Sequence, residues 1–93
     1  MELFELFDLD QFRLDYQRIY NLLNSQYKDY ESYRSMMIMR ENWEKLAKRL
    51  MFEEVVCRQK RKLTNQYQKL HKEFKICQEE LEQSLTMYSL LNM

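Results

Sequence analysis

The most constraining feature of this sequence is that none of its 93 residues is glycine or proline. Average usage would place roughly eleven of these two residues in a chain of this length. The turns that join β-strands depend on residues that accept positive φ angles, and glycine is the usual one. A β-sandwich, a β-barrel or an alternating βαβ fold is therefore excluded in practice, and helix is the regular structure that remains.

The composition predicts a folded chain without a membrane span. Hydrophobic residues make up 45% of the chain, which argues against disorder, and charged residues make up 32%, which argues against a membrane segment. The opening residues are acidic and lack the basic start of a secretory signal. We therefore expect a soluble, intracellular protein of the cytoplasm or nucleus, with Cys57 and Cys77 reduced and packed as small apolar residues.

Apolar and aromatic residues recur at alternating steps of four and three from Phe12 onward, which is the spacing of a coiled-coil seam. This first seam predicts a helix that begins at Asp8, whose carboxylate can accept from the amides of the first turn while Gln11 reaches back. The first seam comprises Phe12, Tyr16, Ile19, Leu23, Gln26, Tyr30, Tyr33 and Met37.

The last third of the chain repeats the same spacing over four heptads. Between the two seams lies a stretch of different phase, whose wide apolar face predicts more than one neighbouring helix. The last seam comprises Leu63, Tyr67, Leu70, Phe74, Cys77, Leu81, Ser84, Tyr88 and Leu91, and the middle face comprises Met36, Met39, Trp43, Leu46, Ala47, Leu50 and Cys57.

The apolar face changes sides between Leu50 and Leu63, because Phe52 and Val56 lie on the back of the middle face at about 100° per residue. Either one straight helix is apolar on two sides and lies inside a bundle, or a bend or break lets a single seam continue. The absence of glycine and proline favours the straight helix.

These patterns predict an all-α protein of long amphipathic helices that form a helical hairpin or an elongated, oligomeric coiled coil. Residues 1–7 would be an acidic, hydrophobic lead-in, and residues 8–93 a single helical domain. The heptad phase first slips within residues 31–42, so a turn, if the chain has one, is placed there. The weak turn candidates are Asn24-Ser25, residues 31–35, Asn42 and Thr64-Asn65.

The net charge is zero but unevenly distributed, with −4 in residues 1–33, +7 in residues 34–75 and −3 in residues 76–93. Antiparallel pairing, within a hairpin or between two chains, would set an acidic arm against the basic middle. Four bases form a compact cluster that can contact nucleic-acid or membrane phosphates, or serve as a nuclear import signal. The competing interpretation is a solvated face that pairs with acidic helices. The cluster comprises Arg58, Lys60, Arg61 and Lys62.

The sequence offers little material for catalysis or metal binding. His71 is the single histidine and lies in a lysine-rich stretch, as expected of a solvated residue. The chain has no glycine-rich phosphate loop. Zinc sites need about four ligands at short spacings, whereas the soft ligands here are Cys57, His71 and Cys77. We therefore expect a protein that is not an enzyme and has no metal or cofactor.

Tyrosine is concentrated near the N-terminus, with five of seven tyrosines within residues 16–33. A buried tyrosine needs a hydrogen-bond partner, whereas an interface tyrosine supplies a large contact area. Residues 12–37 are therefore either part of an aromatic core or a docking face for another protein. The seam positions predicted to contact a partner are Phe12, Tyr16, Ile19, Leu23, Tyr30, Tyr33, Met37, Trp43, Leu50, Leu63, Tyr67, Leu70, Phe74, Leu81, Tyr88 and Leu91.

The segment Leu6-Phe7-Asp8-Leu9-Asp10 resembles the clathrin-box linear motif, in which leucine and bulky residues precede an acid. The wider opening segment is similar to acidic, hydrophobic activation peptides. This likeness covers five residues and would imply a flexible docking peptide. The competing prediction is a lead-in to the first helix, with Leu6 and Leu9 packed against the bundle.

The seams and the charge layout together predict a non-enzymatic coiled-coil interaction protein. It would act as an assembly, scaffold or adaptor subunit that pairs with its own copies or with another helical protein. The alternative is a nucleic-acid-associated accessory protein that uses the basic cluster on phosphate backbone.

Overall fold

A computed structural model describes residues 6–26 and 29–91, without the side chains of residues 25–26 and 88–91. It contains three helices, α1 (Leu9–Gln26), α2 (Tyr30–Lys60) and α3 (Asn65–Leu91), and no strand among the residues described. The all-α fold predicted from the lack of glycine and proline is therefore confirmed. Within these ranges, no helix combines the length and the apolar character needed to cross a membrane.

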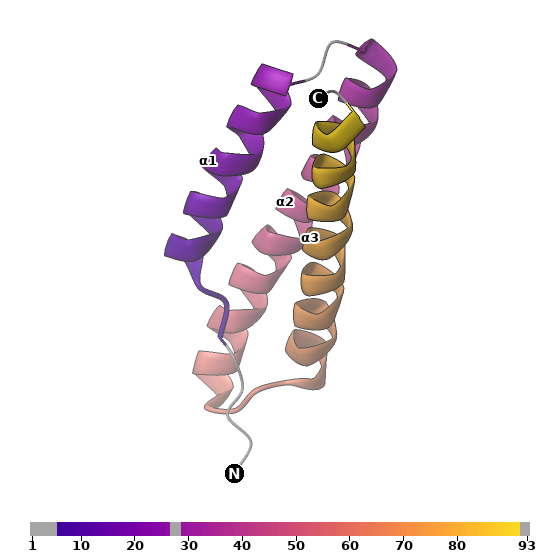
Figure 1. Cartoon of the computed structure of the whole chain (residues 1–93). Helices are drawn as coiled ribbons and strands as arrows, with labels where there is room; N and C mark the ends of the chain where they lie inside the picture. Colours follow the sequence, from indigo (N-terminus) through magenta and orange to yellow (C-terminus); the bar gives the residue numbers. More distant parts are fainter. Residues whose placement is uncertain (1–5, 27–28, 92–93) are drawn as a thin grey trace.

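The three helices run up, down and up along an elongated bundle of 48 × 23 × 19 Å (Figure 1). Helices α2 and α3 form a long antiparallel hairpin, and α1 lies along one side of it (Figure 1). Helix α1 has 18 residues, whereas α2 has 31 and α3 has 27. At about 1.5 Å per residue, α1 therefore reaches along only part of the hairpin.

The start of α1 agrees with the cap predicted at Asp8. The backbone N–H of Gln11 donates to Asp8 Oδ1 at 3.1 Å, and the N–H of Phe12 donates to the Asp8 carbonyl at 3.0 Å. The first bond occupies an amide that has no partner inside the helix, and the second is the first i→i−4 bond of the helix itself. The Gln11 side chain does not reach back, because its Nε2 donates to Asp15 Oδ1 at 3.1 Å one turn later.

Helix α2 runs without a break through residues 31–42, where the phase slip had placed a turn. It begins after Asp29, whose carboxylate accepts from the N–H of Glu31 at 3.3 Å and from Ser32 Oγ at 2.9 Å. The slip has another cause, because α2 packs against both α1 and α3 and so needs a wider apolar face than a two-helix seam. Of the weak turn candidates, Asn24-Ser25 lies nearest in the sequence to the end of α1 at Gln26.

The helix breaks at residues 61–64, so the straight two-sided helix favoured by the missing glycine does not form. Arg61 adopts the left-handed conformation, with φ 56° and ψ 34°. Its N–H donates to the Arg58 carbonyl at 3.2 Å, and the N–H of Lys62 donates to the Cys57 carbonyl at 3.1 Å. This is the Schellman pattern that normally ends in glycine. Arginine can replace glycine because only one residue needs the positive φ.

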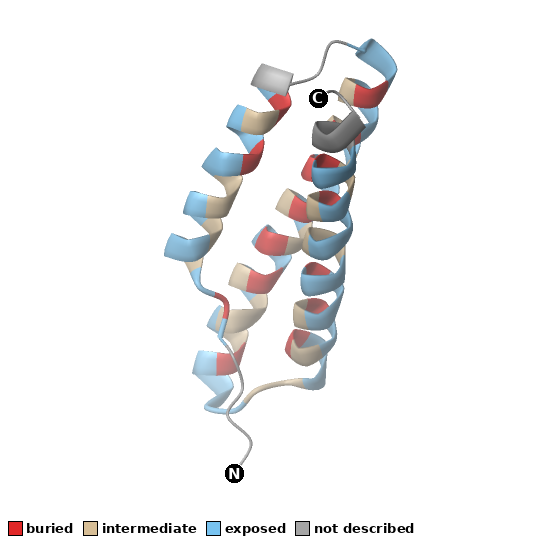
Figure 2. Ribbon diagram, viewed as in Figure 1, coloured by how far each residue is buried: buried red, intermediate tan, exposed pale blue. Residues whose placement is uncertain are grey.

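The core runs along the axis of the bundle, with the buried residues turned toward its centre (Figure 2). At its middle, Phe12 of α1 meets Trp43 of α2 with ring centroids 4.8 Å apart, and Trp43 meets Phe74 of α3 at 5.9 Å. One aromatic cluster thus joins all three helices, with the Phe12 and Trp43 rings tilted by 58° and the Trp43 and Phe74 rings stacked at 21°. The largest fully buried core side chains are Ile19, Leu23, Trp43, Leu50, Tyr67, Leu70 and Leu81.

The segment that resembles a clathrin box packs against the bundle in part. Phe7 is 8% exposed and contacts Phe74, with ring centroids 5.4 Å apart, whereas Leu6 is 52% exposed and Leu9 is half-buried. The predicted lead-in therefore packs through Phe7 and Leu9, and the expectation for Leu6 is wrong. The motif presents only its first leucine freely to solvent, because the next two bulky residues are partly or fully covered.

Candidate functional site

Most residues predicted to contact a partner instead form the core of this chain. A heptad seam shows that a face will be covered, but it does not show whether the cover comes from the same chain or another. Tyr30 is the exception among the described positions, since its side chain is 73% exposed. The buried positions are Ile19, Leu23, Trp43, Leu50, Tyr67, Leu70, Phe74 and Leu81; Phe12, Tyr16, Tyr33, Met37 and Leu63 are half-buried; the side chains of Tyr88 and Leu91 lie outside the described residues.

Helix α1 covers one side of the α2–α3 hairpin through polar as well as apolar contacts. Asp15 accepts a hydrogen bond from Gln78 Nε2 at 3.0 Å, which ties α1 to α3. Arg18 forms an ion pair with Glu82, and this hydrogen bond raises the pKa of the arginine above its ordinary value. These contacts fix which side of α3 faces α1.

Arg40 lies on the side of α2 that faces α1, and it is buried. Its guanidinium carbon lies 5.4 Å from the ring centroid of Tyr16 and 5.3 Å from that of Tyr20. Its Nε and Nη1 atoms have no hydrogen-bond partner. The charge is therefore stabilised by ring faces rather than by a carboxylate.

The opposite side of α2 carries a second heptad stripe, which α1 does not cover. Its residues, Glu31, Ile38, Lys45 and Phe52, follow one another at intervals of seven and are all exposed. Ile38 is 51% exposed and Phe52 is 68% exposed. Residues seven apart lie on one side of a helix, so these four form a continuous stripe with two large apolar positions.

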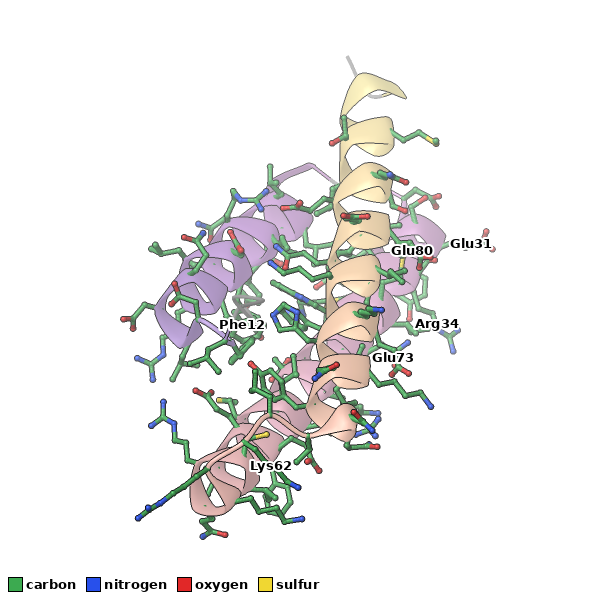
Figure 3. All side chains as sticks on the ribbon, turned by 90° about the horizontal axis from the view of Figure 1, so that it is seen from below. Phe12, Glu31, Arg34, Lys62, Glu73 and Glu80 are labelled. Carbon is green, nitrogen blue, oxygen red and sulfur yellow. The ribbon has the colours of Figure 1, made fainter. Side chains whose placement is uncertain are left out.

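Helix α3 carries a matching exposed stripe. Lys69, Ile76, Glu80 and Met87 are spaced by 7, 4 and 7 residues and are all exposed, which places them on one side of the helix. In Figure 3 the labelled Glu31 and Glu80 side chains lie on the side of the bundle away from α1. We call these two stripes together the open face. It consists of Glu31, Ile38, Lys45 and Phe52 of α2 and Lys69, Ile76, Glu80 and Met87 of α3.

A shallow groove of about 250 Å³ borders the open face between α2 and α3. Phe52 and Arg49 line it from α2, and Gln66 and Leu70 line it from α3, together with Lys48 and Glu53. The groove therefore combines an exposed aromatic ring with two cations. This mixture suits the apolar and charged side chains of an approaching helix.

Charge is separated along the open face. Because α2 and α3 are antiparallel, the N-terminal half of α2 lies beside the C-terminal half of α3. On the side away from α1, this half carries Glu31, Glu80 and Arg34, and the other half carries Lys45, Arg49, Lys69 and Glu73 (Figure 3). The face thus has a half with a net charge of −1 and a half with a net charge of +2, with apolar residues in both.

Phe52 was predicted on the back of the middle face, but the exposed stripe of α2 was not predicted from the sequence. The other large apolar residues of the open face, Ile38, Ile76 and Met87, were not predicted either. The seven-residue spacing from Glu31 to Phe52 is nevertheless visible in the sequence. This spacing is less conspicuous than the heptad repeat on the other side of the same helix, in which all four residues are apolar: Met36, Trp43, Leu50 and Cys57.

The four bases of the cluster lie together at the end of the bundle where α2 turns into α3. All four are exposed, and Figure 3 shows Lys62 at this end. Arg58 Nη2 forms an ion pair with Glu54 Oε1 at 2.9 Å, and the Arg58 side chain is still 75% exposed. The structure therefore brings together the cluster predicted from the sequence and leaves it facing solvent.

A second depression, of about 370 Å³, lies between the start of α1 and the middle of α3. Phe7, Phe12 and Phe74 line it, and Asp15 and Lys75 are among its polar neighbours. No group of three or more His, Cys, Asp or Glu side chains in the described part of the chain is placed to hold a metal ion. The depression offers an aromatic wall beside the half-buried His71 and the charged groups of Asp15 and Lys75.

The two thiols take no part in these surfaces. Cys57 is buried and accepts the N–H of Thr64 at 3.4 Å, so it stabilises the connection between α2 and α3. Cys77 is half-buried, and burial raises the pKa of its thiol. Both cysteines are free. A raised pKa disfavours the thiolate, as expected of a packing residue rather than a reactive one.

The fold and these surfaces define an all-α, antiparallel three-helix bundle with one uncovered helical face and one basic end. No protein-family model matches the chain, and neither a curated protein nor a solved structure matches it.

Proposed function

We propose that this protein is a non-enzymatic assembly subunit whose open face pairs with the open face of a second copy. The observation that carries this proposal is the exposed heptad stripe on α2, with Ile38 and Phe52 on the side that α1 leaves uncovered. A helix that keeps two large apolar residues of a heptad stripe in solvent, between charged residues, is suited to pairing with another helical surface.

The charge layout supports a second copy in antiparallel orientation as the partner. Antiparallel pairing sets Lys45 and Lys69 of one copy opposite the half of the other copy that carries Glu31 and Glu80. Parallel pairing sets like charges together, which opposes association. A two-fold interface uses the same surface twice, so one self-complementary face is sufficient for both copies.

The test is the mass of the full chain in solution, measured by light scattering during size-exclusion chromatography. We expect a mass of twice 11.8 kDa at concentrations of about 100 µM. Burial of a large apolar side chain contributes about 1.5 kcal/mol or more, and each substitution acts twice in a symmetric dimer. Phe52→Glu should therefore weaken the dimer by about 3 kcal/mol, or roughly 100-fold.

Leu14→Glu is the matched control, because Leu14 on α1 and Phe52 are both 68% exposed. Both variants should retain helical circular dichroism, and only Phe52→Glu should shift the mass toward the monomer. A monomeric wild-type chain at this concentration would overturn the proposal. Equal loss of the dimer in both variants would also overturn it, because the open face would then have no special part in pairing.

A further inference from the structure

Positive charge is concentrated around the connection between α2 and α3. Residues 48–72 contain eight basic and two acidic residues, a net charge of +6, so the rest of this neutral chain carries −6. These residues form the end of α2, the connection at residues 61–64 and the start of α3. The hairpin therefore gathers the positive charge at one end of the bundle (Figure 1).

The two acidic residues of this stretch already have basic neighbours. Glu54 forms the ion pair with Arg58, and Glu53 lines the groove beside Lys48 and Arg49. In the described part of the structure, no carboxylate lies within ion-pair distance of the three bases at the turn itself. We call these three bases, Lys60, Arg61 and Lys62, the basic tip.

The backbone of the basic tip is held from both sides. The helix-ending bonds of Arg61 and Lys62 fix it to the last turn of α2. On the other side, Thr64 Oγ1 accepts the N–H of Tyr67 at 3.1 Å and so begins α3. A loop that is already ordered loses little conformational entropy when its side chains bind a ligand.

Arg61 occupies a position where glycine would be the less strained residue. Its positive φ is the only one among the described non-glycine residues. The left-handed conformation costs a residue with a side chain about 1–2 kcal/mol. A long cation at this strained position, flanked by two others, points to a use for the charge in addition to its part in the turn.

We infer that the basic tip binds the phosphate backbone of nucleic acid, a function separate from the pairing of the open face. Duplex DNA presents one negative charge per about 1.7 Å of its axis, so three adjacent cations can each meet a phosphate. Residues 58–62 contain no apolar residue that could enter a lipid bilayer, which disfavours a membrane surface. They also contain no aromatic ring on which an unpaired base could stack, which favours contact with the phosphate backbone over contact with the bases of a single strand.

The test measures fluorescence anisotropy of a labelled DNA duplex of about 20 base pairs, titrated with the full chain at about 50 to 200 mM KCl. We compare the wild type with the triple variant Lys60→Gln, Arg61→Asn and Lys62→Gln, in which asparagine tolerates the left-handed conformation. The variant should bind at least roughly tenfold more weakly, and its plot of log K against log salt should be shallower by about 3, since each phosphate contact contributes about 0.9.

The matched control removes three exposed bases outside both the basic tip and the open face, through Arg13→Gln, Lys72→Gln and Lys75→Gln. It changes the net charge equally, and we expect it to retain binding within about twofold. Circular dichroism melts check that both triple variants fold. Equal losses in the two variants would overturn the inference, because net charge alone would then explain binding. Absence of duplex binding would overturn it too, including the case in which the chain binds phosphatidylserine vesicles instead.

Discussion

The backbone N–H of Phe7 donates a hydrogen bond to the phenolic oxygen of Tyr67 at 2.6 Å, across 60 residues of sequence. Both residues are buried. The bond joins the segment before α1 to the first turns of α3, and it supplies the partner that a buried tyrosine hydroxyl requires. It also leaves the Phe7 amide dependent on a single side-chain atom.

Tyr67→Phe should lower the free energy of unfolding by about 1–2 kcal/mol, because the buried Phe7 amide then loses its acceptor. Urea denaturation followed by circular dichroism measures the change. Tyr30→Phe, at the exposed start of α2, is the control and should change stability by less than about 0.5 kcal/mol. Similar effects of the two variants would contradict the structural role given to the Tyr67 hydroxyl.

Stability should fall in alkaline solution. Burial raises the pKa of Tyr67 above its ordinary value of 10.0, although the bond from Phe7 partly opposes this, and burial also raises the pKa of Cys77 above 9.0. The unfolded chain then loses these protons at lower pH than the folded chain does. Stability is therefore fully retained below about pH 9 and declines as the pH rises through the folded-state pKa values.

Urea titrations at a series of pH values from about 8 to 11 measure this decline. Tyr67→Phe removes one of the two groups, so the stability of this variant should depend less on pH above about 10 than that of the wild type. An unchanged slope in the variant would mean that Tyr67 ionises equally easily in the folded and the unfolded chain.

Arg40→Met should raise the free energy of unfolding by about 1 kcal/mol, because it removes a buried cation without leaving a cavity. The tyrosine rings stabilise the guanidinium only in part, and two of its nitrogen atoms lack a hydrogen-bond partner. Arg40→Ala serves as the contrast and should be destabilising, because the packing of the arginine stem is lost. Thermal denaturation ranks the stability of the two variants and the wild type. An Arg40→Met variant less stable than the wild type would show that the contacts of the guanidinium with the tyrosine rings outweigh the cost of burying its charge.

Arg61→Gly should stabilise the fold by about 0.5–1 kcal/mol, since it relieves the left-handed conformation while increasing the entropy of the unfolded chain. Lys60→Gly, in the last turn of α2, should instead destabilise the fold by about 1 kcal/mol. Urea denaturation measures both changes in the free energy of unfolding. An increase at position 61 and a decrease at position 60 would confirm that Arg61 is strained. A loss of stability at position 61 would indicate that Arg61 is not strained in solution.

The sequence alone indicated that the protein is all helical, because a chain without glycine or proline lacks the residues that usually build the turns of a sheet. It also determined the start of α1 at Asp8 and the compact basic cluster, since a helix cap and a run of neighbouring charges depend on local sequence only. Each of these features is fixed within a few residues along the chain.

The tertiary structure alone decided which face is covered by which neighbour. The seam residues Ile19, Trp43 and Phe74 carry the same heptad spacing whether they pack in one chain or between chains, so the pattern could not distinguish a core from an interface. The sequence offered Thr64-Asn65 as a weak turn candidate but favoured a straight helix over the break at residues 61–64, because Arg61 takes the role of glycine at a cost that the Schellman bonds and the packing of α3 on α2 offset. Once α1 occupies one side of the hairpin, the stripe from Ile38 to Phe52 is left in solvent, and only the relative placement of three helices could show that.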